Sequence, residues 1–246
     1  MRYNAVEKAR FIARPNRFIA HVDLDGRTEV CHVKNTGRCR ELLVPGAAVY
    51  LERSGNPARK TKYDLIAVEK GGLLINMDAQ APNKVFAEWM AAGLGADLGL
   101  PRPDLLRPET TWGNSRFDFY WELSEAPRGN RTDVSRETPI PRKGFVEIKG
   151  CTLEESGLAL FPDAPTERGV KHLRELIACK AAGYEAAVCV VVQMAGMAAF
   201  SPNDRTHPAF GAAMRAAAEA GVDILAVECA VTPDSLVMTK PVPVRL

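Results

Sequence analysis

One stretch of the sequence is almost entirely apolar, and it constrains the fold more than any other. Residues 186–194 read AAVCVVVQM, the pattern of a strand that is buried on both faces. A helical pattern precedes it near Thr166–Ala182, an alanine-rich one follows over Ala209–Ala220, and Ile224–Val231 is a second apolar strand. This alternation predicts parallel strands joined by helical crossovers in the C-terminal part of the chain.

The first 80 residues have a different pattern, in which short strands are separated by turn residues such as Asp25-Gly26 and Gly71-Gly72. The predicted strands are Phe18–Leu24, Thr28–Lys34, Ala47–Arg53, Tyr63–Glu69 and Leu73–Met77. Five short strands without a long helical pattern favour a small barrel of the oligonucleotide-binding (OB) type. The predicted fold class is therefore α/β (α+β), with a five-stranded OB-like barrel over residues 1–81 and a mixed α/β domain over residues 82–246.

Charge is distributed unevenly along the chain. The net charge is +2, but residues 1–80 hold 14 Lys and Arg against 9 Asp and Glu, while the remainder is slightly acidic. A basic N-terminal part favours an anionic partner such as nucleic acid, although a solvated basic surface would give the same balance. The sequence has no apolar run of about 18 residues and no apolar leader, so we expect no membrane association and a cytoplasmic location.

Two opposite charges interrupt the predicted strand Phe145–Glu154. Residues two apart in a strand share one face, so Glu147 and Lys149 lie together. In the preceding predicted strand, Ser115–Leu123, Asp118 alternates with two phenylalanines. Neighbouring strands are only about 4.8 Å apart. If these two strands pair, Asp118 and Glu147 lie close together.

Two carboxylates in a partly dry site repel each other unless a cation neutralises them. Mg²⁺ and Mn²⁺ take oxygen ligands, so Asp118 and Glu147 are predicted to hold one of these metals. Lys149 would then orient or deprotonate an attacking water, or stabilise charge on a phosphate. These residues predict metal-assisted hydrolysis of a phosphodiester. The alternative is an exposed strand whose charges only pair across the sheet.

Longer segments of the chain resemble the sugar fermentation stimulation protein A (SfsA) family, from Arg17 to about Val231. In order, they read RFIAHV, CHVKNTGRCRELLVPGAAVYLE, NSRFDF, FVEIKGCTL, FPDAPTERGVKHLREL and VVVQ. The resemblance implies an OB-like N-terminal domain and a C-terminal domain similar to PD-(D/E)XK nucleases. It also implies DNA binding and, more loosely, regulation of sugar (maltose) utilisation genes.

The resemblance implies catalytic roles for three residues. Asp118 matches the nuclease aspartate, and Glu147 and Lys149 match the ExK pair. Glu88 is placed like the upstream acidic residue of such nucleases, and it is expected as a third metal ligand. The helix that carries it is predicted to begin at Pro82, with Asn83 as its N-cap.

Several further residues are expected to contact the phosphates of a nucleic acid. They are Arg10, Arg14, Arg17, Asn35, Arg38, Arg168, Lys171 and His172. The first three lie near the first predicted strand, the next two belong to the turn-like NTGR segment, and the last three lie on the helix after the ExK strand. The alternatives are a solvated basic arm, a plain turn, and a packed or surface histidine.

Two functions remain open at this point. One is a DNA-binding protein with a Mg²⁺- or Mn²⁺-dependent nuclease site, acting on double-stranded DNA with little sequence preference. The other is a non-catalytic DNA-binding regulator of sugar utilisation genes that keeps a nuclease-like scaffold. Salt-sensitive binding that is indifferent to a chelator would favour the regulator.

Overall fold

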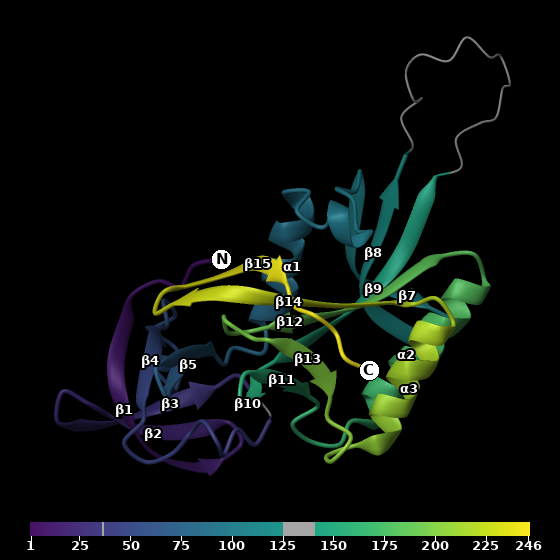
Figure 1. Ribbon diagram of the computed structural model, residues 1–246. Helices are drawn as coiled ribbons and strands as arrows, with labels where there is room; N and C mark the ends of the chain where they lie inside the picture. Colours follow the sequence, from purple (N-terminus) through teal and green to yellow (C-terminus); the bar gives the residue numbers. More distant parts are fainter. Residues whose placement is uncertain (36, 125–140) are drawn as a thin grey trace, which may run out of the picture.

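The computed structural model describes residues 1–35, 37–124 and 141–246, which form a barrel and a larger layered domain (Figure 1). The polar stretch 124–142, for which the sequence favours a hairpin tip or a disordered loop, lies almost entirely outside the described residues. The first residues of the chain contact the larger domain before the chain enters the barrel. The Tyr3 N–H donates a 2.8 Å hydrogen bond to the carbonyl of Asp234.

Five strands close the barrel. They are β1 (Val6–Asn16), β2 (Ile19–Leu24), β3 (Arg27–Val33), β4 (Ala48–Arg53) and β5 (Tyr63–Lys70). Their order is β3-β2-β1-β4-β5, and the ends meet where β3 and β5 pair in parallel, with Cys31 opposite Tyr63. Closure leaves no unpaired edge within the ring. The predicted five-stranded OB-like barrel is therefore confirmed.

The membership of the ring differs from the prediction. The last predicted strand, Leu73–Met77, is found as β6 (Leu73–Asn76), which pairs only with β5 and extends the sheet beyond the ring. The fifth barrel strand is β1, which the sequence did not predict. Only Ala9 and Phe11 of this strand are buried, and its register with β2 shifts twice, so the alternation that marks a half-buried strand is too short to recognise.

The larger domain is built on a six-stranded sheet with the order β15-β14-β12-β9-β8-β7. The strands are β7 (Leu105–Trp112), β8 (Ser115–Leu123), β9 (Arg142–Cys151), β12 (Glu185–Val192), β14 (Asp223–Thr232) and β15 (Ser235–Pro241). The central strand β12 runs parallel to both β9 and β14. The predicted parallel crossovers are therefore confirmed.

Helices cover both faces of this sheet. On one face lies α1 (Ala81–Ala91), and on the other lie α2 (Glu167–Ala181) and α3 (Pro208–Glu219). The short 3-10 helix η1 (Ala96–Leu98) follows α1. Thr166 caps α2 by accepting a 3.1 Å bond from the Gly169 N–H. Among the described residues, no helix is long and apolar enough to cross a membrane.

A smaller sheet lies beside the large one and consists of β10 (Leu153–Glu155), β11 (Leu158–Phe161) and β13 (Ala199–Pro202). Strands β10 and β11 form a hairpin that turns at Ser156-Gly157, as predicted. The sequence did not predict β7, β13 or β15. Both β7 and β15 are edge strands, and edge strands bury too few side chains to show a clear apolar pattern.

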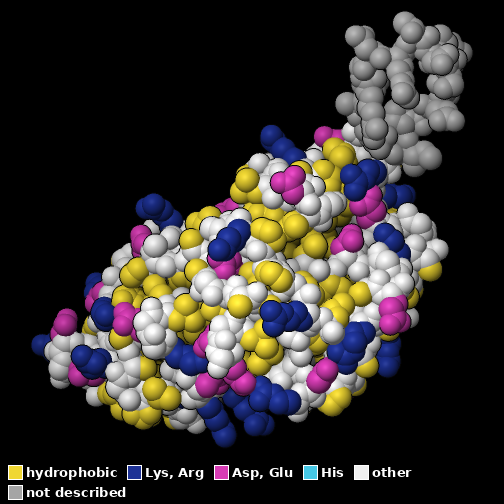
Figure 2. Space-filling model, viewed as in Figure 1, with side chains coloured by type: hydrophobic (Ala, Val, Ile, Leu, Met, Phe, Trp, Pro, Cys, Tyr) yellow, Lys and Arg dark blue, Asp and Glu magenta, His cyan; other side chains and the backbone are white. Residues whose placement is uncertain are grey.

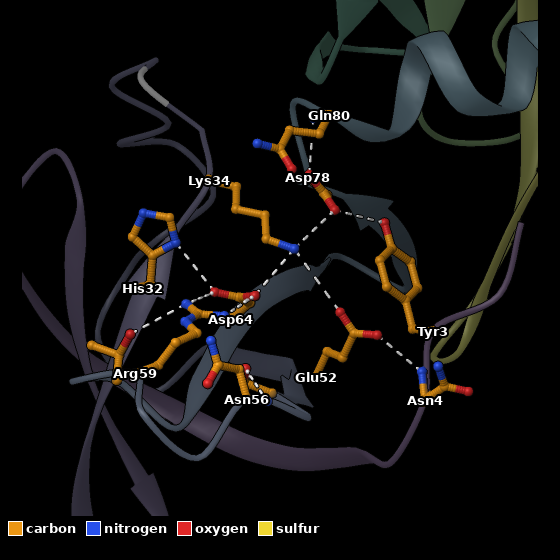
Figure 3. A network of polar contacts seen from close by, with 12 residues as sticks. Tyr3, Asn4, His32, Lys34, Glu52, Asn56, Arg59, Asp64, Asp78 and Gln80 are labelled. Carbon is orange, nitrogen blue, oxygen red and sulfur yellow. Dashed lines mark hydrogen bonds and ion pairs between the residues drawn. The ribbon is translucent and has the colours of Figure 1, made fainter.

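A buried polar network joins the barrel to the segment that leads into α1 (Figure 3). Lys34, just after β3, places its Nζ 3.1 Å from Asp64 Oδ2 and 3.6 Å from Asp78 Oδ2, and both carboxylates are almost fully buried. Arg59 donates bonds of 2.9 and 2.6 Å to the two oxygens of Asp64. Burial alone would raise the pKa of Asp64, but the bonds from Arg59 and Lys34 outweigh it and lower that pKa to about 2.

Candidate functional site

A cleft opens where two strands of the large sheet separate. The ladder between β8 and β9 ends at the pair Phe119 and Val146, and the next residues along the strands are Asp118 and Glu147. We call this hollow, of about 600 Å³, the carboxylate cleft. Its lining residues are Ala79, Gln80, Pro82, Asn83, Asp118, Glu147, Ile148, Lys149, Gly150, Thr166, Arg168 and Gly169. The structure thus brings together the three residues predicted as the catalytic set.

Asp118 is held by two donors. Its Oδ2 accepts a 2.8 Å bond from the Ile148 N–H, which takes the place of a ladder bond to β8, and its Oδ1 accepts a 2.8 Å bond from Asn83 Nδ2. Burial raises the pKa of Asp118, and the neighbouring charge of Glu147 raises it further. The prediction of Asn83 as N-cap is wrong. Helix α1 begins after Gln80, and the Asn83 side chain donates a hydrogen bond to Asp118 instead.

Glu147 is buried, and its two oxygens differ. Its Oε1 lies 2.5 Å from Lys149 Nζ and also contacts His172 Nδ1, whereas its Oε2 is buried and has no hydrogen-bond partner among the described residues. Burial alone would raise the pKa of Glu147, but the bond from His172 and the charge of Lys149 outweigh it and hold that pKa below its usual range. The site therefore favours the ionised form of Glu147. Its Oε2 has no hydrogen-bond partner in the described part of the chain.

His172 is a packed histidine. The sequence left open a phosphate contact and a packed or surface side chain, and the side chain is only 5% exposed. Its Nε2 accepts a 3.3 Å bond from Arg168 Nε, so we assign the proton to Nδ1, which donates to Glu147. His172 thus orients Glu147, while the exposed Arg168 extends along the wall of the cleft.

Gly150 allows helix α1 and strand β9, which both line the cleft, to lie close together. A Cβ atom at this position would lie 2.8 Å from Pro82 Cγ and 2.6 Å from Gln193 Oε1, closer than side chains tolerate. The absence of a side chain lets the first turn of α1 lie against β9. That contact brings Asn83 within reach of Asp118.

Replacing Asp118 with asparagine is expected to stabilise the metal-free protein by about 1 kcal/mol near neutral pH. An acid whose folded-state pKa is raised destabilises the fold above that pKa and not below it, so the gain should shrink as the pH falls through the pKa of Asp118. Asparagine can still accept from the Ile148 N–H, and Asn83 can turn its amide. Denaturant unfolding in chelator at neutral and acid pH measures the difference, with the exposed Asp97→Asn as control. A variant less stable than wild type at neutral pH would contradict the conclusion that the buried charge of Asp118 destabilises the fold.

The possible metal ligands are fewer than the sequence suggested. Among the described residues, no group of three or more His, Cys, Asp or Glu side chains lies close enough together to hold one metal ion. Glu88, the predicted third ligand, does not line the cleft, and its carboxylate lies 2.7 Å from the N-terminal amine of Met1. The structure therefore leaves Asp118 and Glu147 as the carboxylates that face the cleft.

A second hollow, which we call the basic groove, lies between the barrel and the larger domain. Its volume is about 590 Å³, and its lining residues are Phe11, Ile12, Ala13, Arg14, Asn16, Arg17, Gly37, Arg38, Arg40, Leu43, Pro45 and Ala164. Figure 2 shows Lys and Arg side chains along the lower edge of the molecule, where the barrel meets the larger domain. Arg17, Arg38 and Arg40 are exposed, and none forms an ion pair with a described residue.

Arg14 has a structural role in this groove. Its guanidinium donates to the carbonyls of Arg17, Asn35, Gly37 and Arg38 at 2.6 to 2.9 Å. Four carbonyl partners leave it little capacity for a phosphate, so the prediction of Arg14 as a phosphate contact is corrected. Arg14 instead holds the NTGR segment in the position that presents Arg38.

The other predicted phosphate contacts are spread over the surface. Asn35 accepts a 2.8 Å bond from the Gly37 N–H and shapes the same turn. Arg10 lines a separate hollow beside β2 and lies 3.4 Å from the carbonyl of Gly46. Lys171 donates a 2.8 Å bond to the carbonyl of Asn114. The structure brings Arg17, Arg38 and Arg168 near the two hollows, and does not bring Arg10 there.

The basic groove and the carboxylate cleft are each lined by a residue of the same short segment. Ala164 lines the groove, and Thr166, two residues later, lines the cleft. Arg168 lines the cleft and also the exposed face of α2, beside Lys171 and Arg174. Basic side chains therefore line both hollows and the adjoining face of α2, where Glu167 and Glu175 lie among them.

Two residues that line these hollows escaped the sequence reasoning. Arg40 lines the groove two positions after Arg38, and the repeated arginine in NTGRCR was the available signal. Asn83 was noticed only as a helix cap, and its bond to Asp118 depends on packing between α1 and β8 that no local pattern encodes.

Comparisons with known proteins agree over both parts of the chain. A family model described as the SfsA N-terminal OB domain matches residues 12–77, and one described as the sugar fermentation stimulation protein RE domain matches residues 80–235. A sugar fermentation stimulation protein homolog from Desulfitobacterium hafniense (strain Y51) is 52% identical over 246 residues, which are 100% of this chain and 99% of that protein. One from Clostridium beijerinckii is 51% identical over 237 residues, 96% of each chain.

A solved structure is similar over the whole length. It is that of Pyrococcus furiosus SfsA in complex with Ca²⁺, which superposes with a TM-score of 0.84 at 26% sequence identity. The similarity covers 100% of this chain and 98% of that one.

Proposed function

The chain belongs to the sugar fermentation stimulation protein family, and on that premise we propose that it binds DNA and hydrolyses phosphodiester bonds at the carboxylate cleft with a divalent cation. The observation that carries this proposal is the buried Oε2 of Glu147, which has no hydrogen-bond partner in the part of the chain that the structure describes and lies beside a second carboxylate, Asp118. A buried carboxylate oxygen without a hydrogen bond is costly, and a cation would satisfy it.

The residues present fit a hard divalent cation. Mg²⁺ is commonly held by one or two carboxylates, with water and substrate phosphate as the remaining ligands, so Asp118 and Glu147 suffice. The pKa of Asp118 is raised because its charge is buried beside Glu147, and a cation would remove that penalty for both residues. The related Pyrococcus furiosus protein was solved with Ca²⁺, another cation that prefers oxygen ligands. When bound, the cation would favour ionisation of the attacking water and offset charge on the phosphate.

The protein's own residues would position the reactants. His172 and Lys149 fix Glu147, while Asn83 and the Ile148 N–H fix Asp118. Lys149 lines the cleft, where its ammonium can orient the attacking water or stabilise charge on the phosphate. Arg168 can bind a phosphate oxygen through its outer nitrogens, because its Nε is engaged by His172. This arrangement supports a relationship to PD-(D/E)XK nucleases.

Cleavage of DNA tests the proposal. Wild-type protein should cut a plasmid or its single-stranded circular form in Mn²⁺ or Mg²⁺ and lose this activity in chelator, and Asp118→Asn should be inactive on both. Glu88→Gln should cleave as wild type does, because Glu88 lies outside the cleft. If wild type cuts no faster than Asp118→Asn, the catalytic part of the proposal fails. Salt-sensitive DNA binding without cleavage would then leave the non-catalytic regulator.

A further inference from the structure

Exposed apolar side chains gather at the basic groove. The described residues include seven large hydrophobic side chains that are exposed, and three of them belong to this groove or its rim: Ile12 (39% exposed), Phe18 (50%) and Val44 (48%). Ile12 lines the groove, Val44 stands between two lining residues, and Phe18 follows the lining residue Arg17. Figure 2 shows hydrophobic and basic side chains next to each other along the lower edge of the barrel.

The backbone of Phe18 is anchored while its ring is exposed. It lies in the tight turn between β1 and β2, and its backbone is held by a 2.9 Å bond from its N–H to Asn16 Oδ1. The Arg17 guanidinium stands 6.0 Å from the centre of the Phe18 ring. The ring is thus fixed at its base, open to solvent on much of its surface, and next to a cation that can hold a phosphate.

These features favour one kind of occupant. A duplex presents phosphates outwards and keeps its bases stacked inside, so it offers no exposed base face to an aromatic ring such as Phe18. A single strand exposes base faces that stack on aromatic rings, while its phosphates follow basic residues. At about 590 Å³, the groove has the size of a small-ligand pocket and suits a short stretch of one strand.

We propose that the basic groove binds a single-stranded polynucleotide, with a base stacked on Phe18 and the phosphates on Arg17, Arg38 and Arg40, and that this strand leads into the carboxylate cleft. Ala164 lines the groove and Thr166 lines the cleft, so only a short segment of chain separates the two hollows along the proposed course of the strand. The substrate is then a single strand or the frayed end of a duplex, rather than the intact double-stranded DNA that the sequence suggested. This inference rests on the proposed function only for the step that cuts the strand.

Fluorescence anisotropy in chelator tests the binding step without cleavage. The probes are a labelled single-stranded DNA, the same sequence as RNA, and the DNA duplex, each measured over a range of salt. We expect at least one single strand to bind about 10-fold more tightly than the duplex, and the two single strands to show which sugar is preferred. Equal or tighter binding of the duplex would overturn the inference.

Variants separate stacking from charge. Phe18→Ala should weaken single-strand binding by about 10-fold with an unchanged salt slope, whereas Arg38→Ala should reduce the slope by about 0.7. Val30→Ala is the matched control, because Val30 is another exposed apolar residue of the barrel that does not line the groove. Melting temperatures verify that each variant folds. If Phe18→Ala binds the single strand as Val30→Ala does, the inference is wrong.

The outcome is independent of catalysis. Phe18-dependent binding of a single strand, without any cleavage that needs Glu147, supports the groove and counts against the nuclease. Cleavage of intact duplex that needs Glu147 and is unaffected by Phe18→Ala supports the nuclease and overturns the groove.

Discussion

Replacing Glu147 with glutamine is expected to reduce metal-dependent cleavage by about 1,000-fold or more, since a bound cation supplies several kcal/mol of transition-state stabilisation. Glutamine keeps the size of the side chain and an oxygen for Lys149 and His172. It replaces the unpartnered Oε2 with an amide nitrogen, which carries two hydrogens and cannot bind a cation. The loss should therefore reflect metal binding rather than a change in shape.

Stability in the presence of metal provides a second measurement. Mn²⁺ at 100 times its dissociation constant should stabilise the wild type by about 2.7 kcal/mol, and this stabilisation should be absent from Glu147→Gln. Glu109→Gln is the matched control, because Glu109 is exposed on β7 and pairs only with Arg116. Wild-type levels of cleavage in Glu147→Gln would remove this residue from the catalytic set.

Replacing Lys34 with methionine is expected to destabilise the protein by about 3 kcal/mol. Asp64 and Asp78 are almost fully buried, and without the ammonium they lose a shared counter-charge. The pKa of Asp64 is lowered to about 2, so its contribution to stability is fully present above its unfolded pKa. That contribution is lost as the pH falls from about 4 to about 2. The difference between wild type and variant should shrink over the same range.

Denaturant unfolding near neutral pH measures the effect of Lys34→Met. Lys8→Met is the control, because Lys8 forms an exposed ion pair with Glu69 at 2.9 Å, and such pairs contribute no more than about 1 kcal/mol. Equal losses in the two variants would mean that the network in Figure 3 contributes no more than a surface ion pair.

The elements with strong local signals were predictable. The all-apolar run that became β12 requires burial on both faces, and the stripe of α2 has the period of an amphipathic helix, so both were found. The strand β1 was missed because its exposed arginines and two shifts of register hide its alternation. Which strands close the barrel depends on the pairing of β3 with β5, a contact distant in sequence.

In the candidate site too, features with a local sequence signal were predicted, and features that depend on distant contacts were not. The proximity of Asp118 and Glu147 followed from the period of two and from pairing of adjacent strands. The sequence could not decide between a packed and a phosphate-facing His172, because its helical position does not reveal that it contacts Glu147. The same holds for Arg14, whose four carbonyl partners come from a turn that folds back on it. Distant packing therefore decides which polar residues position the site and which face the solvent.

Anomalous scattering from a crystal soaked in Mn²⁺ would be the most direct test of the metal site. We expect a single strong peak within coordination distance of the carboxylates of Asp118 and Glu147, on the side of the unpartnered Oε2, and its disappearance in Glu147→Gln. An ordered cleft without a peak, in crystals where Mn²⁺ reaches other sites, would contradict a metal-dependent phosphodiesterase at this position.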